Sequence, residues 1–235
     1  MAVPGLEIDM APRRQWLLST VATKVLIALT GLSLAGFLCV HLAGNLLLYF
    51  GPAKFNAYSH ALISNPFVIP LELGLLAIFV VHVLQAATNW WSDRDARPAA
   101  YQVKRGAGGR SRKSVASSTM IWTGSLMFVF VAVHIATMKY GAWYPATIHG
   151  EDGRDLYRLV REVFQNPAWV AFYVACMAVV GFHLWHGFSS AFESLGVNGA
   201  RFTPRIVAMG KVFAALVGAG FFFIPLYLFF IGGRS

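Results

Sequence analysis

The chain has 235 residues, of which 57% are hydrophobic and 12% are charged, and its mean hydropathy is +0.59. This composition is unusual for a water-soluble domain and ordinary for a protein with several membrane spans. The formal net charge of +9 would suit nucleic-acid binding, but the basic residues gather beside apolar segments, which argues against that partner. The composition therefore indicates an integral membrane protein in contact with lipid.

Five apolar segments are long enough to cross the ~30 Å hydrocarbon core of a bilayer, which takes roughly 20 helical residues. We place these segments near residues 23–49, 66–91, 116–138, 167–191 and 206–231. A span must satisfy its own backbone hydrogen bonds, so continuous runs of this kind predict helices. We expect one domain over residues 1–235, an all-α bundle of five transmembrane helices. The first segment is longer than a signal-peptide core, so no cleaved leader is expected.

The first segment carries a histidine, His41, in its C-terminal part, with Gly31, Gly36 and Gly44 around it. Small residues let a neighbouring helix or a large flat ligand approach closely. These glycines therefore favour close packing around His41.

The second segment carries His82 and the acidic residue Glu72. Glu72 is the only acidic residue well inside an apolar segment. A carboxylate at that depth is neutralised, paired or functional. Proton handling and a structural hydrogen bond both remain open for Glu72.

The basic residues predict how the segments are oriented. The side of the N-terminus, which includes the basic loop 93–113, carries thirteen lysines and arginines, and the opposite side carries six. The positive-inside rule then places the N-terminus in the cytoplasm and the C-terminus outside. Besides setting topology, the loop 93–113 could bind anionic lipid or a partner subunit.

The third segment carries His134, and a long outer loop, 139–166, follows it. Apolar residues in this loop recur at helical spacing, which predicts a short surface helix. They are Leu156, Leu159, Val160 and Val163. His60 and His149 fall in predicted outer loops, where a solvated histidine is the default and proton exchange the alternative. No internal repeat is expected.

The fourth segment carries His183 and His186, and the fifth carries no histidine. The two cysteines, Cys39 and Cys176, lie inside apolar segments without C-x-x-C spacing. The sequence therefore predicts neither an iron–sulfur cluster nor covalently attached haem. Buried packing is expected for both cysteines.

Four histidines thus lie one in each of the first four segments, and the direction of each segment gives the depth of its histidine. His41 and His134 fall toward the outer leaflet, whereas His82 and His183 fall toward the cytoplasmic leaflet. Two histidines at one depth on different helices are the axial pair of a six-coordinate haem iron. The pattern therefore predicts two b-type haems. His186 is an alternative ligand to His183, because three residues of helix leave them on nearly the same face.

Four stretches resemble the cytochrome b membrane anchor of succinate dehydrogenase and fumarate reductase, in its single-subunit form with five helices and two haems. They are T-G-L-S-L-A-G-F-L-C-V-H-L-A-G-N-L-L-L-Y-F-G (30–51), F-N-A-Y-S-H (55–60), E-L-G-L-L-A-I-F-V-V-H (72–82) and H-L-W-H-G-F-S-S-A-F-E-S-L-G (183–196). The resemblance covers segments one to four and is specific in the stretches that carry histidine.

The resemblance implies that His41 and His134 hold the haem far from the soluble subunits, and that His82 and His183 hold the nearer one. In the family the fourth ligand stands four residues before a glycine, which matches His183 with Gly187. The resemblance also implies two partners: a flavoprotein subunit with FAD, where succinate and fumarate interconvert, and an iron–sulfur subunit docked on this anchor.

The expected function is therefore that of an enzyme subunit in the inner membrane of the cell, carrying electrons between the iron–sulfur subunit and a quinone. The resemblance points to menaquinone, and Glu72 would handle protons at its outer pocket. Two other functions stay open: the cytochrome b anchor of a hydrogenase or formate dehydrogenase, and a haem-free transporter that couples to protons.

Overall fold

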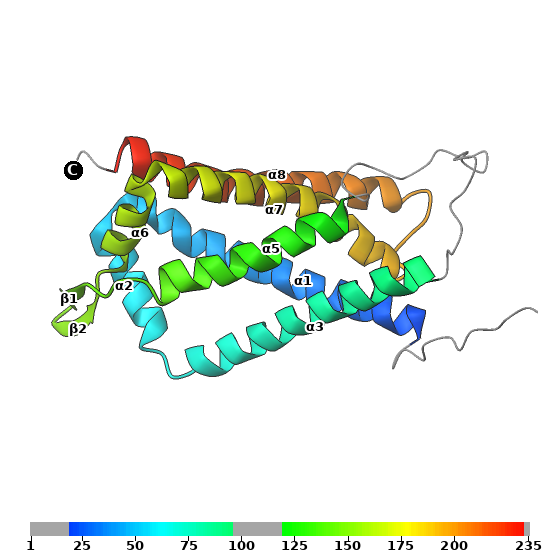
Figure 1. Cartoon of the computed structure of the whole chain (residues 1–235), viewed down its shortest axis with the longest axis horizontal. Coiled ribbons are helices and arrows are strands. Elements are labelled where there is room, and N and C mark those ends of the chain that lie inside the picture. The colour runs from blue at the N-terminus through cyan, green and yellow to red at the C-terminus, as the bar shows by residue number, and fades with distance from the viewer. Residues whose placement is uncertain (1–18, 96–118, 233–235) are drawn as a thin grey trace, which may run out of the picture.

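The computed structural model describes residues 19–95 and 119–232, most of which are helical (Figure 1). Its helices are α1 (Thr20–Asn45), the 3-10 turn η1 (Leu46–Phe50), α2 (Pro52–Ile63), α3 (Val68–Asp95), α5 (Met120–His134), the π-helical turn η2 (Ile135–Lys139), α6 (Leu156–Gln165), α7 (Pro167–Ser194) and α8 (Thr203–Phe230). Two strands, β1 (Pro145–Ile148) and β2 (Glu151–Arg154), pair antiparallel. Most of the basic loop 93–113 lies outside the described residues. Its expected binding to anionic lipid or a partner subunit therefore stays a prediction.

Within the described ranges, five helices are long and apolar enough to cross a membrane. They are Thr20–Phe50, Val68–Asp95, Met120–Lys139, Pro167–Ser194 and Thr203–Phe230. Each overlaps one predicted segment, so the prediction of a mainly helical, multi-pass membrane protein is confirmed. A helix of 28 residues such as α3 measures about 42 Å, so it extends beyond a hydrocarbon core of about 30 Å.

Helix α3 shows why these helices need an apolar environment. It has no buried residue, although it is apolar enough to cross a membrane. Leu71, Leu73 and Leu84 on this helix are each more than half exposed. A contiguous apolar surface of this kind is unfavourable in water, and lipid would cover it.

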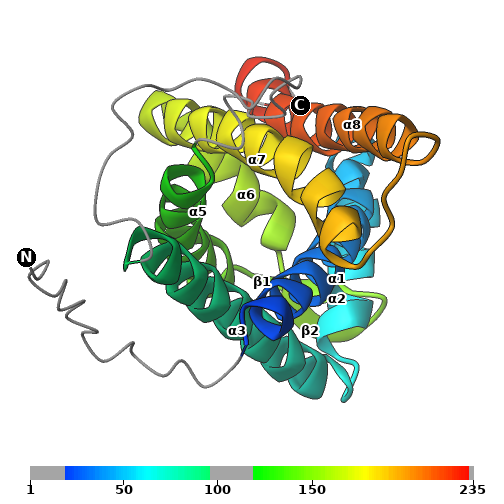
Figure 2. The same cartoon turned by 90° about the vertical axis from the view of Figure 1, so that its right-hand side faces the viewer.

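Four helices, α1, α3, α5 and α7, form a ring around the middle of the bundle, as the end-on view shows (Figure 2). Helix α1 packs against α3 and α7, and α5 packs against the same two helices. Therefore α1 faces α5, and α3 faces α7, diagonally across the ring. Helix α8 lies outside the ring and packs most extensively against α7.

A glycine contact brings α7 and α8 close together. A Cβ atom built on Gly218 of α8 would lie 3.3 Å from the Cα atom of Gly181 on α7. The two backbones are thus nearly in contact, which is how helices associate without a hydrophobic driving force in lipid. Elsewhere, Leu228 of α8 is fully buried.

One end of the bundle, here the hairpin end, carries α2, the β1–β2 hairpin and α6; the other is the far end (Figure 1). Helices α1, α5 and α8 run toward the hairpin end, and α3 and α7 run away from it. Asn56 of α2 donates to Asp155 at 2.7 Å and accepts from the Tyr157 N–H at 2.9 Å. Asp155 also caps the N-terminus of α6. Buried Asn56 therefore joins α2 to α6.

Arg154 closes the chain reversal between η2 and the hairpin. Its guanidinium donates to the carbonyl oxygens of Lys139, Gly141 and Ala142 at 2.8–2.9 Å. Burial lowers the pKa of Arg154, but the group stays charged at any physiological pH. The Arg154 side chain thus satisfies carbonyls that the end of the span leaves open.

The elements at the hairpin end were predicted only in part. The short helix expected within 139–166 is present as α6, with Leu159 and Val160 buried. Helix α2 and the hairpin were not predicted. His60 lies on α2 rather than in a loop, and its Nε2 atom is 3.0 Å from Glu151, so the expectation of a solvated loop histidine is wrong. His149 lies in the turn between the strands, with a φ of 52°.

The expectation for the two cysteines is right for one of them. Cys176 on α7 is buried, whereas Cys39 on α1 is exposed on the surface of the bundle. Both faces of a membrane helix are apolar, so hydropathy does not tell the face toward protein from the face toward lipid.

Candidate functional site

The four histidines lie in two pairs, each formed across the ring of helices. The rings of His41 on α1 and His134 on α5 have centroids 5.8 Å apart, and their planes lie at 84° to each other. His82 on α3 contacts α1 at Thr30 and Gly31, and His183 on α7 contacts α5 at Thr123 and Gly124, so these two rings share a second level. Because α1 faces α5 and α3 faces α7, each pair joins two diagonally opposite helices.

The pairs occupy two levels along the bundle. His82 contacts α1 at Thr30 and Gly31, and His41 follows Gly31 by ten residues, about 15 Å of helix. In the same way His183 contacts α5 ten to eleven residues before His134. The His41–His134 pair is therefore nearer the hairpin end, and the His82–His183 pair is nearer the far end.

Two threonines determine which nitrogen of the far-end histidines carries hydrogen. The Thr30 hydroxyl donates to the Leu26 carbonyl at 2.6 Å, and its oxygen lies 3.1 Å from Nδ1 of His82. With its single hydrogen in use, Thr30 can only accept from Nδ1–H. The hydrogen of His82 is therefore on Nδ1, and the Nε2 lone pair remains free to bind a metal ion.

His183 is held in the same way. The Thr123 hydroxyl donates to backbone carbonyls of its own helix, and its oxygen lies 3.1 Å from Nδ1 of His183. This bond again places hydrogen on Nδ1 and leaves Nε2 free. Outer partners of this kind orient a histidine ligand and raise its basicity.

His134 is held through a tyrosine. The Thr137 hydroxyl donates to the Val133 carbonyl at 2.9 Å and lies 2.7 Å from the Tyr173 hydroxyl. Since the hydrogen of Thr137 is in use, Tyr173 donates to Thr137 and can accept from Nδ1–H of His134, 3.5 Å away. This longer contact gives His134 the same Nδ1–H form.

His41 has a different partner. The amide nitrogen of Asn45 donates to the His41 carbonyl at 2.7 Å and lies 3.4–3.5 Å from both ring nitrogens. Phe37 stacks on the His41 ring with centroids 5.3 Å apart, and Phe130 stacks on the His134 ring at 5.6 Å. These aromatic rings limit how the hairpin-end histidines can turn.

Glycines make room for the far-end histidines. A Cβ atom on Gly31 would lie 3.1 Å from Cε1 of His82, and one on Gly124 would lie 3.5 Å from Cε1 of His183. Of the glycines expected to allow close approach, Gly31 therefore serves a histidine on another helix. Gly44 makes room for the Tyr58 ring instead, and Gly36 has no neighbour within 4 Å.

His186, the alternative to His183 in the sequence prediction, has a different environment from that of His183. It lies three residues after His183 on α7, is partly buried, and interacts electrostatically with Glu193. Thr123 bonds His183 and places it opposite His82. The pairing across the ring therefore involves His183.

Glu72 forms an ion pair in the structure. Its carboxylate accepts from the ammonium group of Lys139, and each side chain is about half exposed, 46% and 47%. The pair ties α3 to η2 at the hairpin end. Of the fates open to a carboxylate in an apolar segment, pairing is the one observed.

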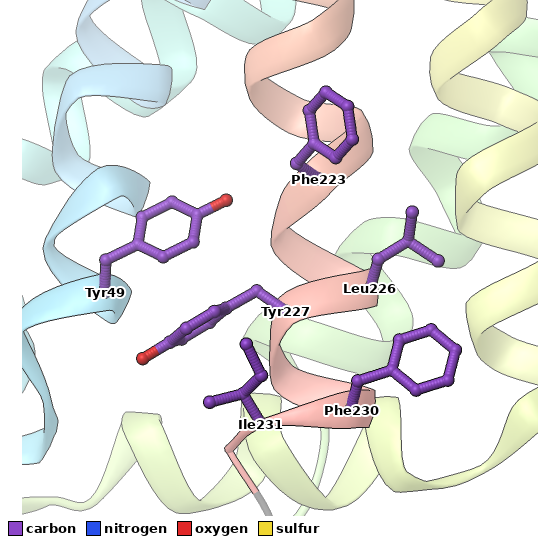
Figure 3. Close-up of a pocket in the computed structure, with 6 residues that line it drawn as sticks. All are labelled: Tyr49, Phe223, Leu226, Tyr227, Phe230 and Ile231. Atoms are coloured by element: carbon purple, nitrogen blue, oxygen red, sulfur yellow. The ribbon is translucent and has the colours of Figure 1, made fainter.

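A separate apolar pocket of about 340 Å³ lies between η1 and the C-terminal part of α8 (Figure 3). It is lined by Tyr49, Phe223, Leu226, Tyr227, Phe230 and Ile231. The two tyrosine rings have centroids 4.5 Å apart. None of the four paired histidines lines it, so it is distinct from the histidine site.

No family model, curated protein or solved structure matches the chain. Within residues 19–95 and 119–232, no group of three or more histidine, cysteine, aspartate or glutamate side chains could hold a metal ion. Such a group would build an all-protein metal site, whereas a haem iron takes only its axial ligands from the protein.

The sequence predictions named the four histidines but missed the residues that hold them. These are Thr30, Thr123, Thr137, Tyr173 and Asn45. Threonines are common in membrane helices, so each looks ordinary alone. A signal was nevertheless present: Thr-Gly stands before both His41 and His134 at the same spacing.

Proposed function

We propose that this protein is a dihaem cytochrome b that carries electrons across a membrane, with His41 and His134 as axial ligands of one haem and His82 and His183 of the other. The observation that supports this most is the pairing of histidines across the ring of helices at two levels. Two haems stacked along the bundle would supply a chain of one-electron carriers through a low-dielectric layer.

The residues present fit such a ligand set. Two imidazoles on opposite sides of one metal ion have ring centroids on the order of 6 Å apart, because each metal–nitrogen bond is about 2.0 Å. The centroids of His41 and His134 are 5.8 Å apart. The bonds at Nδ1 of His82 and His183 leave their Nε2 atoms free, as axial ligation requires.

We propose further that the chain is the membrane anchor of a succinate dehydrogenase or fumarate reductase, and so a subunit of an enzyme. This rests on the resemblance of its histidine-bearing stretches to that family. An iron–sulfur subunit would exchange electrons with it, a flavoprotein subunit with FAD would carry the dicarboxylate chemistry, and a membrane quinone, menaquinone in this proposal, would take or give the electrons.

The charge distribution supports one orientation for this assembly. In the full sequence the side of the N-terminus, where α1 begins at the far end, carries thirteen lysines and arginines against six on the opposite side, whereas the described residues divide five and five. By the positive-inside rule this end would face the cytoplasm of a cell whose inner membrane holds the protein. The His82–His183 pair would then be nearer the iron–sulfur subunit.

Glu72 is the candidate for proton handling at an outer quinone site. Its pairing with Lys139 at the hairpin end keeps a carboxylate and an ammonium group together at the level where quinone would exchange protons. Charged residues at membrane depth pair with one another and commonly mark proton pathways.

The test is a reduced-minus-oxidised spectrum of the purified full chain, followed by histidine replacement. We expect b-type absorbance from two haems per chain. His82→Ala and His183→Ala should each remove the same haem, while His186→Ala, the matched control on α7, should keep both. Absence of b-type absorbance from the unaltered chain would exclude both cytochrome functions and favour the proton-coupled transporter.

A further inference from the structure

The first and third spans share a pattern, T-G-x5-F-x3-H. Its members are Thr30, Gly31, Phe37 and His41 in α1, and Thr123, Gly124, Phe130 and His134 in α5.

The members of the pattern make the same contacts in both spans. Each threonine oxygen lies 3.1 Å from Nδ1 of a histidine on the next long helix, His82 or His183. Each glycine is the small residue beside that same histidine, and each phenylalanine stacks on the histidine of its own span. Helices α1 and α3 thus form a half of the ring that corresponds to α5 and α7.

We propose that Thr30 and Thr123 are matched positioning residues that set the reduction potential of the haem held by His82 and His183. This inference rests on the proposed function. Each threonine acts through its histidine: it accepts the Nδ1 hydrogen, fixes the ring, and leaves the Nε2 lone pair free.

The direction of the effect follows from the hydrogen bond. An acceptor at Nδ1–H raises the basicity of the imidazole, and a more basic ligand favours the oxidised, more positive iron. Removing the acceptor should therefore raise the potential of that haem. Each hydroxyl can act as an acceptor because its hydrogen is donated to a carbonyl oxygen of its own helix. For Thr30 this acceptor is the Leu26 carbonyl oxygen, 2.6 Å from Oγ1.

The chain offers a matched control. Thr137 also donates to a carbonyl of its own helix, but it acts on His134 through Tyr173. Replacing Thr137 should therefore affect only the haem at the hairpin end. This control has the same change in size and polarity on a span that also carries Thr123.

The experiment is a redox titration of both haems in membranes that contain the full chain with Thr30→Val, Thr123→Val or both. Valine keeps the shape of threonine without its hydroxyl. We expect each single change to alter the reduction equilibrium of the same haem about tenfold, an upward shift of about 59 mV. Thr30→Ser and Thr123→Ser should restore the original potential, and Thr137→Val should leave that haem unchanged.

Several outcomes would overturn the inference. They are unchanged potentials in both valine variants, shifts in different haems, or serine variants that behave like valine. If a valine variant loses the haem, the serine variant at the same position decides the outcome. Retention of the haem in the serine variant supports the inference, and its loss from the serine variant as well contradicts the inference. Failure of the proposed function gives another result, because the unaltered chain would then have no b-type absorbance.

Discussion

Gly31 and Gly124 occupy equivalent positions in the two halves, yet they have different room beside their histidines, and this difference gives a sharp prediction. A Cβ atom on Gly31 would lie 3.1 Å from Cε1 of His82, whereas one on Gly124 would be 3.5 Å from Cε1 of His183. An ordinary carbon–carbon contact is about 3.5–4.0 Å. Gly31→Ala must therefore displace the His82 ring by about 0.4 Å, and Gly124→Ala need not move His183.

The displacement also affects the bond that holds the ring. The distance from Thr30 Oγ1 to Nδ1 of His82 is 3.1 Å, and a further ~0.4 Å would bring it to the limit of a hydrogen bond. Loss of such a partner typically lowers metal affinity about 10–100-fold. In Gly124→Ala, the added methyl group meets no such obstacle, and helix propensity favours alanine by about 1 kcal/mol in water.

The assay is the haem content per chain and the potential of each haem, measured for both variants purified in the same detergent. We expect Gly31→Ala to bind the haem proposed for the His82–His183 pair more weakly or to shift its potential, and Gly124→Ala to match the unaltered chain. Equal effects of the two substitutions, or no effect of either, would refute the reasoning from contact distances.

Two further predictions concern Glu72 and the packing of α8. Glu72→Gln should lower quinone turnover about 100-fold with both haems retained. Lys139→Met breaks the same ion pair but keeps the carboxylate, so it should have a smaller effect on turnover. Unchanged turnover in Glu72→Gln would leave Glu72 a structural residue. Gly218→Ala should destabilise the bundle by about 1–3 kcal/mol, because its Cβ would lie 3.3 Å from the Gly181 backbone. Gly181→Ala is the control, because a Cβ atom there would lie 3.8 Å from its nearest neighbour. Thermal unfolding followed by circular dichroism measures the stability of the two glycine variants. Equal melting temperatures of Gly218→Ala and Gly181→Ala would contradict the close approach of α7 and α8.

The spans could be predicted because a bilayer imposes one simple requirement, a run of about 20 apolar residues. The level of each histidine followed from the direction of its span, so His41 was expected beside His134 without any knowledge of side-chain contacts. Lys139 was assigned to a loop, so its pairing with Glu72 was not foreseen. That pairing depends on η2, a π-helical turn that extends α5 to Lys139.

The hairpin end was harder to predict because its elements are fixed by contacts between distant residues. Asn56 and Asp155 are separated by 99 positions, and their hydrogen bond joins α2 to α6. Strands of four residues carry too little hydrophobic pattern to be recognised alone. The threonines that hold the histidines are visible in the sequence only when the first and third spans are aligned with each other.

The diagonal arrangement of the histidines has a consequence for assembly. The half formed by α1 and α3 contributes His41 and His82, and the half formed by α5 and α7 contributes His134 and His183. Neither half has both members of either pair, so the chain resembles a dimer whose two subunits are joined covalently. A cofactor that binds only the joined halves stabilises their union as its concentration rises above its dissociation constant. Binding of the cofactor and association of the two halves into the ring of four helices would then be a single equilibrium.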